Sequence, residues 1–371
     1  MKIKDLINKI ETLAPPELQE SYDNSGLQIG NADLECTGAL ISLDITEDVL
    51  DEAIEMNCNL IIAHHPLLFK GLKRISPDSW INRCVIKAIR HDLNIYAVHT
   101  NLDNVYEGVN QMLAKRIGLK NIQILAPVKG SFSKLVCFIP IAEGERPEAH
   151  LEEVKNAVFK AGAGKIGEYD CCSFSMKGIG TFRAGDRTNP FVGEKGTIHH
   201  QAEYRFEVIM PSYLNNRIVK ALIQAHPYEE VAYDLFSLSN ETNQIGAGMI
   251  GELERSENSE DFLKRIKNLF NCRVIRHTQV IKDEIKKVAV CGGSGSFLLE
   301  DAIKQQADIY ISGDFKYHQF FDADKRIMIA DIGHYESEQF TIDLLADYLH
   351  ENFTNFAVQK SVIDTNPIKF L

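Results

Sequence analysis

One order of elements occurs twice in the chain. Residues 39–63 read as a short apolar run, a turn, an amphipathic stretch and a second apolar run, and residues 286–313 repeat this order. Short continuous apolar runs are typical of buried parallel strands. Each copy is followed by a further strand, a polar turn that contains histidine and a long amphipathic stretch, at 94–118 and 326–350. The pattern predicts an α/β fold built from a duplicated three-layer unit.

The texture of the sequence changes between the two copies. From residue 128 to residue 240, short β-like runs alternate with turns, and two helical stretches separate them. The order strand–helix–strand–strand–helix–strand is that of a ferredoxin-like α+β module. A stretch of this length with its own apolar faces fits a domain better than a loop. We therefore expect residues 1–127 and 241–371 to form one discontinuous domain, with 128–240 as an inserted domain.

The composition is that of an ordinary globular protein and narrows the range of partners. Lys and Arg total 40 against 52 Asp and Glu, a formal net charge of −12, which argues against a general nucleic-acid or anionic-membrane binder. No apolar run approaches the roughly 18 residues of a transmembrane helix, and the amphipathic start differs from a signal peptide. The eight cysteines are scattered without a C-x-x-C pair, as is typical of reduced thiols in cores. We therefore expect a cytoplasmic protein without a thiolate zinc site.

Polar clusters that contain histidine follow three of the predicted strands. Ligands of open α/β sheets bind beyond the carboxyl ends of the strands, so these clusters are candidate site residues. His64 and His65 follow the strand at 60–63, and the proline after them lets both rings turn into one cleft. Taken alone, such a pair is as often structural as functional.

The second and third clusters add carboxylates. After the strand at 95–98, Asp103 offers a hard oxygen ligand, although an aspartate before an amphipathic helix is more often its N-cap. His99 is either a ligand or a partner that orients one. In the corresponding turn of the second half, His334 and Glu338 are four residues apart at a predicted helix start, so they share one face and reach one ion. Acidic capping of that helix is the alternative.

Together these clusters supply five candidate metal ligands. They are His64, His65, Asp103, His334 and Glu338. Five ligands exceed the four of a tetrahedral zinc site and suit two ions with a bridging carboxylate and open positions for water. Two ions about 3.5–4 Å apart lower the pKa of a bridging water, which points to hydrolysis. Histidine and carboxylate ligands accept zinc, manganese or iron. We expect Glu338 and His99 to take part in catalysis.

Three further features are weaker candidates. The turn Gly292–Gly295 precedes a helix and could offer backbone N–H groups to a phosphate, but it lacks the P-loop pattern, and a tight turn is the preferred interpretation. The duplication places Asp314 and His318 at the same cleft, as partners of the ligands or contacts of the substrate. Histidines of the insert could bind an ion or ligand, although structural roles in turns are preferred. They are His199, His200 and His226.

Six segments of the chain resemble the GTP cyclohydrolase 1 type 2 homologue family, also called NGG-interacting-factor-3-like. They are YDNSGLQIG (22–30), AHHPLLF (63–69), HTNLDNV (99–105), GGSG (292–295), SGDFKYH (312–318) and GHYESE (333–338). The segments run through both halves, and the combination of AHHP with GHYESE is specific. Within the insert, GTFRAGDRTNPFVG and HPYEEVAYDLF resemble the PII/CutA-like inserted domain of the longer bacterial members.

The resemblance implies a site with two divalent metal ions in each subunit and a ring-shaped homohexamer, a toroid. The family's ligands fall on the five positions given above, with Glu338 as the bridge, and zinc is favoured over manganese or iron. The family name implies that a metal-bound hydroxide opens the guanine imidazole ring of GTP and releases formate. Two alternatives remain: hydrolysis of another nucleotide or phosphorylated substrate, or a non-catalytic regulatory ring whose insert senses a small molecule. The sequence contains no guanine-reading motif.

Overall fold

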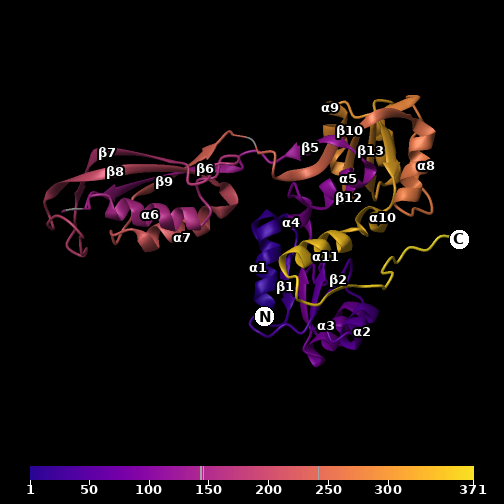
Figure 1. Ribbon diagram of the computed structural model, residues 1–371, viewed down its shortest axis with the longest axis horizontal. Helices are drawn as coiled ribbons and strands as arrows, with labels where there is room; N and C mark the ends of the chain where they lie inside the picture. Colours follow the sequence, from indigo (N-terminus) through magenta and orange to yellow (C-terminus); the bar gives the residue numbers. More distant parts are fainter. Residues whose placement is uncertain (143, 145, 241) are drawn as a thin grey trace. The chain divides into compact units, whose positions relative to one another are not determined.

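The structure, a computed structural model, describes residues 1–142, 144, 146–240 and 242–371. The described chain divides into two compact units. Unit 1 comprises Met1–Pro127 and Asn243–Leu371, and unit 2 comprises Val128–Thr242, so the chain leaves unit 1, forms unit 2 and returns (Figure 1). Among the described residues, every helix is too short or too polar to span a bilayer.

The first sheet of unit 1 has five strands in the order β1-β4-β3-β2-β15. Their bounds are β1 Gly26–Ile29, β2 Ala39–Ser42, β3 Leu60–Ala63, β4 Asn94–Ala97 and β15 Val358–Lys360. All except β1 run parallel. Strands β2, β3 and β4 are fully buried because helices cover both faces of the sheet. One face packs against α1 (Ile3–Leu13) and α11 (Thr341–Asn352), and the other packs against α2 (Glu47–Glu55) and α3 (Trp80–Arg90).

The second sheet of unit 1 has six strands in the order β11-β14-β13-β12-β10-β5. Their bounds are β5 Lys120–Pro127, β10 Gly246–Asn258, β11 Arg276–His277, β12 Glu284–Ser294, β13 Ile309–Gly313 and β14 Met328–Asp331. Strands β12, β13 and β14 are parallel, as β2, β3 and β4 are in the first sheet. One face packs against α5 (Val109–Ile117) and α8 (Ser259–Leu269), and the other against α9 (Leu299–Lys304) and the 3-10 segment Tyr317–Ala323.

The two halves of unit 1 exchange helices. Helix α5 follows β4 of the first sheet, yet Leu113, Ala114 and Ile117 pack in the core of the second sheet. Helix α11 follows β14 of the second sheet, yet Leu345 and Leu349 pack in the core of the first. Figure 1 accordingly shows α11 beside α1, and α5 beside β10 and β12. The exchange ties each half to the other through two apolar cores.

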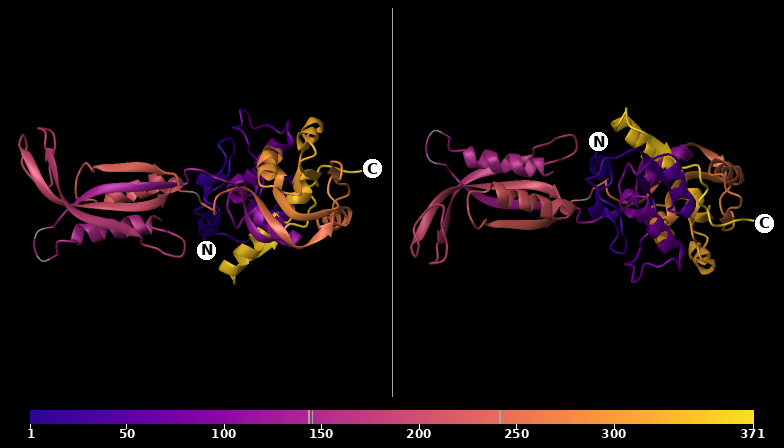
Figure 2. Two further views of the ribbon diagram at one scale, coloured as in Figure 1. Left: turned by 90° about the horizontal axis from the view of Figure 1, so that it is seen from above. Right: turned by 90° about the horizontal axis from the view of Figure 1, so that it is seen from below.

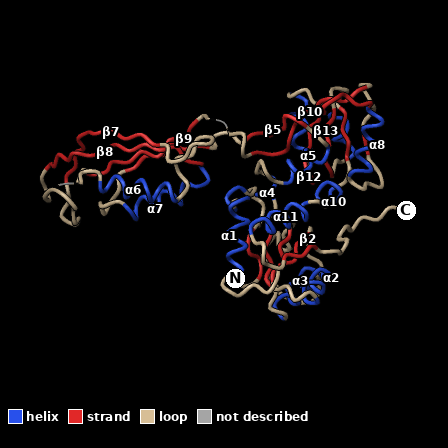
Figure 3. Tube along the Cα trace, in the orientation of Figure 1, coloured by secondary structure: helices blue, strands red, loops and turns tan. Residues whose placement is uncertain are grey.

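Unit 2 contains one antiparallel sheet of four strands and two helices. Its elements are β6 Phe132–Pro140, α6 Ala149–Lys160, β7 Ser173–Arg183, β8 Ile198–Pro211, α7 Asn215–Ala225 and β9 Tyr233–Leu238. The strand order is β7-β8-β6-β9, and the order of elements along the chain is the one that the sequence predicts. Both helices pack on one face of the sheet (Figure 3), and the view from below in Figure 2 shows them side by side.

The cysteines follow the prediction with two exceptions. All eight are free thiols, and six are buried. Cys171 is exposed and Cys172 is half-buried, so the expectation of core packing is wrong for this pair. Cys171 also has a positive φ of 53°, which places it in a turn rather than in a core strand.

Candidate metal centre

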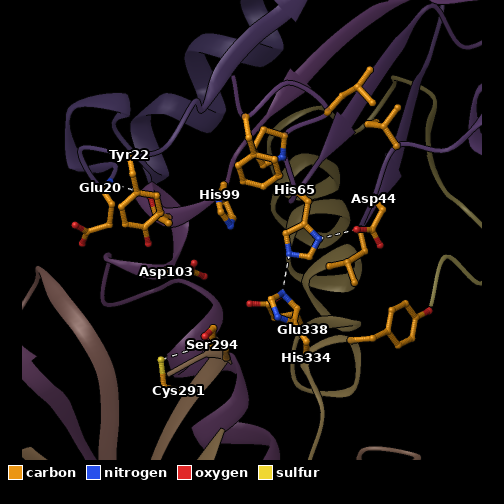
Figure 4. A pocket seen from close by; sticks show the side chains of 18 of the residues that line it. Glu20, Tyr22, Asp44, His65, His99, Asp103, Cys291, Ser294, His334 and Glu338 are labelled. Carbon is orange, nitrogen blue, oxygen red and sulfur yellow. Dashed lines mark hydrogen bonds and ion pairs between the residues drawn. The ribbon is translucent and has the colours of Figure 1, made fainter. Parts of the chain in front are cut away.

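The five predicted ligands come together at the carboxyl ends of strands in unit 1. His64 and His65 directly follow β3. Asp103 ends the short helix α4 (Thr100–Asp103) after β4, and His334 and Glu338 are the first and last residues of α10 (His334–Glu338) after β14. Figure 4 shows the labelled members of this set, with His99, around one open space. These ligands all lie at or just beyond strand ends, which brings together residues as distant in the chain as His65 and Glu338, 273 positions apart.

Glu338 lies between two groups of ligand atoms. Its Oε2 atom is 3.0 Å from Nε2 of His65 and 3.1 Å from Nε2 of His334. Its Oε1 atom is 3.7 Å from Nε2 of His64, which is itself 3.7 Å from Oδ1 of Asp103. All ligand atoms within each group lie within 4.8 Å of one another. One carboxylate that faces two ligand groups is an arrangement that suits a pair of cations.

Two buried atoms at the centre have no hydrogen-bond partner among the described residues. They are Nε2 of His64 and Oδ1 of Asp103. A buried polar atom without a partner costs free energy, and such atoms in native structures call for an explanation such as an ion. Both atoms are the kinds of ligand that divalent transition metals accept. The residues present therefore fit a metal centre.

Four imidazoles at the site share one hydrogen-bonding pattern. Each has Nδ1 at hydrogen-bond distance from an oxygen acceptor: Val98 O for His64, Asp44 for His65, Asp23 for His99 and Asp314 for His334, at 2.9, 2.8, 2.8 and 2.7 Å. An Nδ1–H donated to such an acceptor leaves the lone pair on Nε2. Metal-ligating histidines are held in this way, which fixes the ring and raises its basicity.

The charged groups of the site shift one another's pKa values. Burial lowers the pKa of His65, but hydrogen bonds with Asp44 and Glu338 outweigh it and raise that pKa to about 9. His334 behaves likewise, since Asp314 and Glu338 overcome its burial and raise its pKa to about 11.

The pKa values of the two carboxylate ligands are shifted in opposite directions. Burial raises the pKa of Glu338, but hydrogen bonds from His334 and His65, together with the nearby imidazole of His64, hold it well below its usual range. For Asp103, burial and then the neighbouring charge of Glu338 raise the pKa to about 7. The metal-free site is therefore rich in protons that a cation would displace.

The glycine-rich segment 292–295 packs against the site instead of presenting its N–H groups to a phosphate. Strand β12 continues through Ser294, and its pairing with β13 is irregular between Val290 and Ser294. The N–H groups of Gly292, Gly293 and Gly295 donate to Asn110 Oδ1, Ser337 Oγ and Ser312 Oγ, at 2.9, 2.9 and 3.0 Å. These N–H groups are used within the protein, so the phosphate interpretation is wrong for them. A Cβ on Gly293, which has φ +57°, would lie 2.3 Å from Oε1 of Glu338, so glycine is needed there for close approach.

Of the remaining predictions for the first and second halves, one is confirmed and two are wrong. Asp314 is a partner of a ligand, as its contact with His334 shows, whereas His318 is exposed against Tyr317 and outside the cavity lining. The N-cap interpretation of Asp103 is wrong, because the next helix α5 begins after Gly108.

The histidines of the insert fit structural roles. Nε2 of His199 lies 3.1 Å from Gln201 Oε1, and Nε2 of His226 lies 3.0 Å from the carbonyl of Phe138. Neither they nor His200 belongs to a metal-ligating group among the described residues.

Sequence reasoning missed two carboxylates. Asp44 lies two residues beyond β2, so the strand-end rule that selected the other residues would have found it. Asp23 precedes β1, and no strand ends before it. It accepts hydrogen bonds from His99 and from the backbone of Thr100, and only the resemblance segment 22–30 pointed to it.

A cavity of about 710 Å³ opens over the candidate metal centre. Among the described residues, its lining includes no lysine or arginine. Aromatic side chains form much of the wall; they are Tyr22, Phe69, Trp80, Phe297 and Tyr335. The volume is that of a small-molecule site, and aromatic walls offer stacking to a planar group.

The chain resembles known proteins over its whole length. Residues 1–367 match the family model of Duf34/NIF3 (NGG1p interacting factor 3). A protein of Halalkalibacterium halodurans named GTP cyclohydrolase 1 type 2 homolog is 39% identical, with 99% of this chain and 98% of the relative covered. A protein of Bacillus subtilis with the same name is 35% identical, with 99% and 98% covered.

Solved structures agree with this assignment. A Bacillus cereus protein related to NIF3 has a TM-score of 0.80 at 36% identity, over 100% of this chain and 99% of that chain. A Staphylococcus aureus protein has a TM-score of 0.77 at 32% identity, over 100% and 99%. The folded core, the clustered histidines and carboxylates and these matches lead to one conclusion: the chain belongs to the Duf34/NIF3 family.

Proposed function

We propose that this protein is a hydrolase that depends on two divalent metal ions and acts on a planar nitrogen heterocycle, with GTP as the first candidate substrate. The observation that carries the proposal is Glu338, whose two oxygens face two separate groups of ligand atoms. The name of the Halalkalibacterium halodurans and Bacillus subtilis relatives supports GTP as the candidate. The reaction would be hydrolytic opening of the guanine imidazole ring, with formate as a product.

The ligands would be His64 and Asp103 on one side of Glu338, and His65 and His334 on the other. When bound, the cations would supply Lewis acidity and lower the pKa of water at the site. Zinc is the favoured metal, and manganese and iron suit the same donors.

His99 is placed to move a proton at this site. Its Nδ1 bonds to Asp23, and its ring lines the cavity with Phe69 at a centroid distance of 5.8 Å. Burial raises the pKa of Asp23, but hydrogen bonds from His99 and Thr100 bring it below its usual range. A carboxylate in that state keeps the proton of His99 on Nδ1, so Nε2 can accept a proton from attacking water and return it later.

The cavity walls set a condition on the substrate. Aromatic rings such as Trp80 and Tyr335 can stack on a purine, whereas the described lining offers a triphosphate no lysine or arginine. Turnover of guanosine therefore has to be measured beside turnover of GTP. Comparable rates would assign recognition to the base, and a requirement for phosphate would favour the alternative of a phosphorylated substrate.

The decisive test compares two glutamates of one helix. Purified protein should contain about two equivalents of metal per chain and release formate from GTP. Glu338→Gln should lose both the metal and the formate, whereas Glu336→Gln, which changes a carboxylate outside the ligand groups, should keep both. Formate release that persists in Glu338→Gln would refute the hydrolase. Full metal content without turnover of any nucleotide would favour the non-catalytic metal-binding ring.

We also propose an oligomeric state, a domain type for the insert and a cellular location. Membership of the family supports a ring-shaped homohexamer, which light scattering of the purified protein tests directly. The likeness of the insert to PII/CutA-like domains is proposed on its motifs and its strand order β7-β8-β6-β9. A cytoplasmic location is proposed because all eight cysteines are free thiols.

A further inference from the structure

Unit 2 contains a cavity of its own, of about 490 Å³. Its wall is formed by the end of β7, the loop after β7, the middle of β8 and the segment 228–232. Four aromatic side chains line it; they are Phe138, Phe182, Phe191 and Tyr228. Nothing in the metal centre of unit 1 uses these residues, so the cavity needs an explanation of its own.

A buried carboxylate forms part of the cavity wall. Glu203 of β8 is 7% exposed. Its Oε1 atom accepts a hydrogen bond from the Tyr228 hydroxyl at 3.0 Å. Its Oε2 atom has no hydrogen-bond or ion-pair partner among the described residues and is not one of their buried unpartnered atoms, so it is open to the solvent of the cavity. A carboxylate oxygen in this position is normally paired with water or with a cationic group.

Other buried carboxylates in the described chain are compensated. Asp331 pairs with Arg276, and Asp308 pairs with Lys282 and also accepts two backbone N–H groups. Glu52 accepts from Ser361 and from the backbone of Val362. Outside the metal centre, Glu203 differs from them because a single neutral hydroxyl is its partner.

The sequence makes room for this carboxylate. A Cβ on Gly180 would lie 2.0 Å from Oε2 of Glu203. Gly180 lies inside strand β7 and lines the same cavity. Glycine within a strand weakens it and often marks a place of close approach. Here the approaching group is the unpaired oxygen of Glu203, which therefore lies at the cavity wall.

Aromatic rings pack against Tyr228, the hydrogen-bond partner of the carboxylate. The Tyr228 ring lies 6.3 Å from Phe182 and 6.1 Å from Phe191, between centroids. The loop that carries Phe191 is attached to the opposite wall, because the Asn189 N–H donates to Glu229 Oε1 at 2.8 Å. Aromatic faces next to a carboxylate form the combination that recognises ammonium ions.

The net charge of the cavity lining also favours a cation. It includes three carboxylates, Glu203, Glu229 and Glu230, against one guanidinium, Arg183. Arg183 is exposed and makes no ion pair with Glu203. We propose that this cavity of unit 2 binds a small organic ammonium ion, with Glu203 as its counter-ion and Phe182, Phe191 and Tyr228 around its alkyl groups. The site is distinct from the metal centre and does not depend on the proposed hydrolase.

Tetramethylammonium is the probe that tests the proposal, with tert-butanol as a neutral molecule of similar shape. Binding to the full chain is followed through the methyl protons of each probe by saturation-transfer NMR. Tetramethylammonium should bind at least about tenfold more tightly than tert-butanol, because charge adds to the contact with the rings. Glu203→Gln should weaken tetramethylammonium binding by about tenfold or more, and it retains an oxygen acceptor for Tyr228, so folding is preserved.

Three matched variants locate the binding. Phe191→Ala should weaken it several-fold, as expected for a lost cation–π contact. Glu153→Gln, which changes an exposed carboxylate of α6 outside the cavity lining, and Glu338→Gln, in unit 1, should leave it within about twofold. Equal binding of tert-butanol, unchanged binding by Glu203→Gln, loss in Glu338→Gln, no binding at all, or preferential binding of acetate through Arg183 would each overturn the proposal.

Discussion

Asp314 and His334 meet just beyond the ends of two neighbouring parallel strands, with Oδ2 of the aspartate 2.7 Å from Nδ1 of the histidine. The first sheet contains a comparable pair, since Asp44 beyond β2 lies 2.8 Å from Nδ1 of His65 beyond β3. In both pairs the carboxylate comes from the adjacent strand, and Nε2 of the histidine lies close to Oε2 of Glu338. The two histidines are thus oriented by the protein alone.

Removing either orienting charge should weaken metal binding. We expect Asp44→Asn and Asp314→Asn each to lower metal affinity about 10–100-fold, because a neutral amide no longer raises the basicity of the histidine behind it. Competition with a chromogenic chelator measures this affinity. Asp343→Asn, which disrupts an exposed ion pair with Lys360, is the control and should bind metal normally. Normal affinity in both test variants would show that these carboxylates only pack beside the site.

Metal binding should strengthen as the pH rises. In the metal-free protein the pKa of Asp103 is raised to about 7 and that of His65 to about 9, and the metal requires both groups deprotonated. Apparent affinity should therefore increase from pH 6 to pH 9, and binding at pH 7 should release protons. Calorimetry in buffers of different ionisation enthalpy counts those protons. Binding without proton release would contradict the assignment of His65 as a ligand.

Adding one methyl group at Gly293 should displace the central carboxylate. Gly293→Ala should cost about 1–2 kcal/mol for a left-handed alanine, and it should also lose metal, since the new Cβ would collide with Glu338. Gly130→Ala is the matched control, because Gly130 has a similar φ of +66° with no atom near the added Cβ. Elemental analysis and thermal unfolding separate the two effects. If both variants bound metal equally, close approach at Gly293 would be unimportant.

The Asp23–His99 pair should affect turnover more than metal content. We expect Asp23→Asn to reduce kcat about 10²–10⁴-fold on a substrate that the enzyme accepts, because His99 loses the carboxylate that fixes its tautomer. The metal content should stay near that of the unmodified protein. Asp33→Asn, which removes an exposed partner of Lys4, is the control. A parallel loss of metal would instead identify His99 as a ligand.

Much of the fold could be predicted from local sequence. The apolar runs at 60–63 and 95–98 correspond to β3, Leu60–Ala63, and β4, Asn94–Ala97, because a buried parallel strand has no polar face to obscure it. The four-residue spacing of His334 and Glu338 correctly predicted one helix face. Both predictions depend on the periodicity of neighbouring residues, which the sequence displays directly.

What escaped prediction depends on contacts between distant segments. Nothing near α5 indicates that Leu113 packs on the second sheet, because an amphipathic helix has the same pattern whichever sheet it covers. Asp103 was open to interpretation as an N-cap because neither helix α4, which ends at Asp103, nor the turn of residues 104–108 before α5 was visible in the sequence. The role of Gly293 required the position of Glu338, which lies 45 residues later in the chain and on another element.

The exchange of α5 and α11 has a consequence for how the chain reaches its native state. During synthesis the strands β2, β3 and β4 emerge early, but one of the two helices that cover one of their faces and the strand that pairs with β2 belong to residues 341–360. Until those residues leave the ribosome, the edge of β2 and the part of that apolar face which α11 covers stay open to other chains. A stalled or clipped polypeptide would therefore aggregate rather than form a working half.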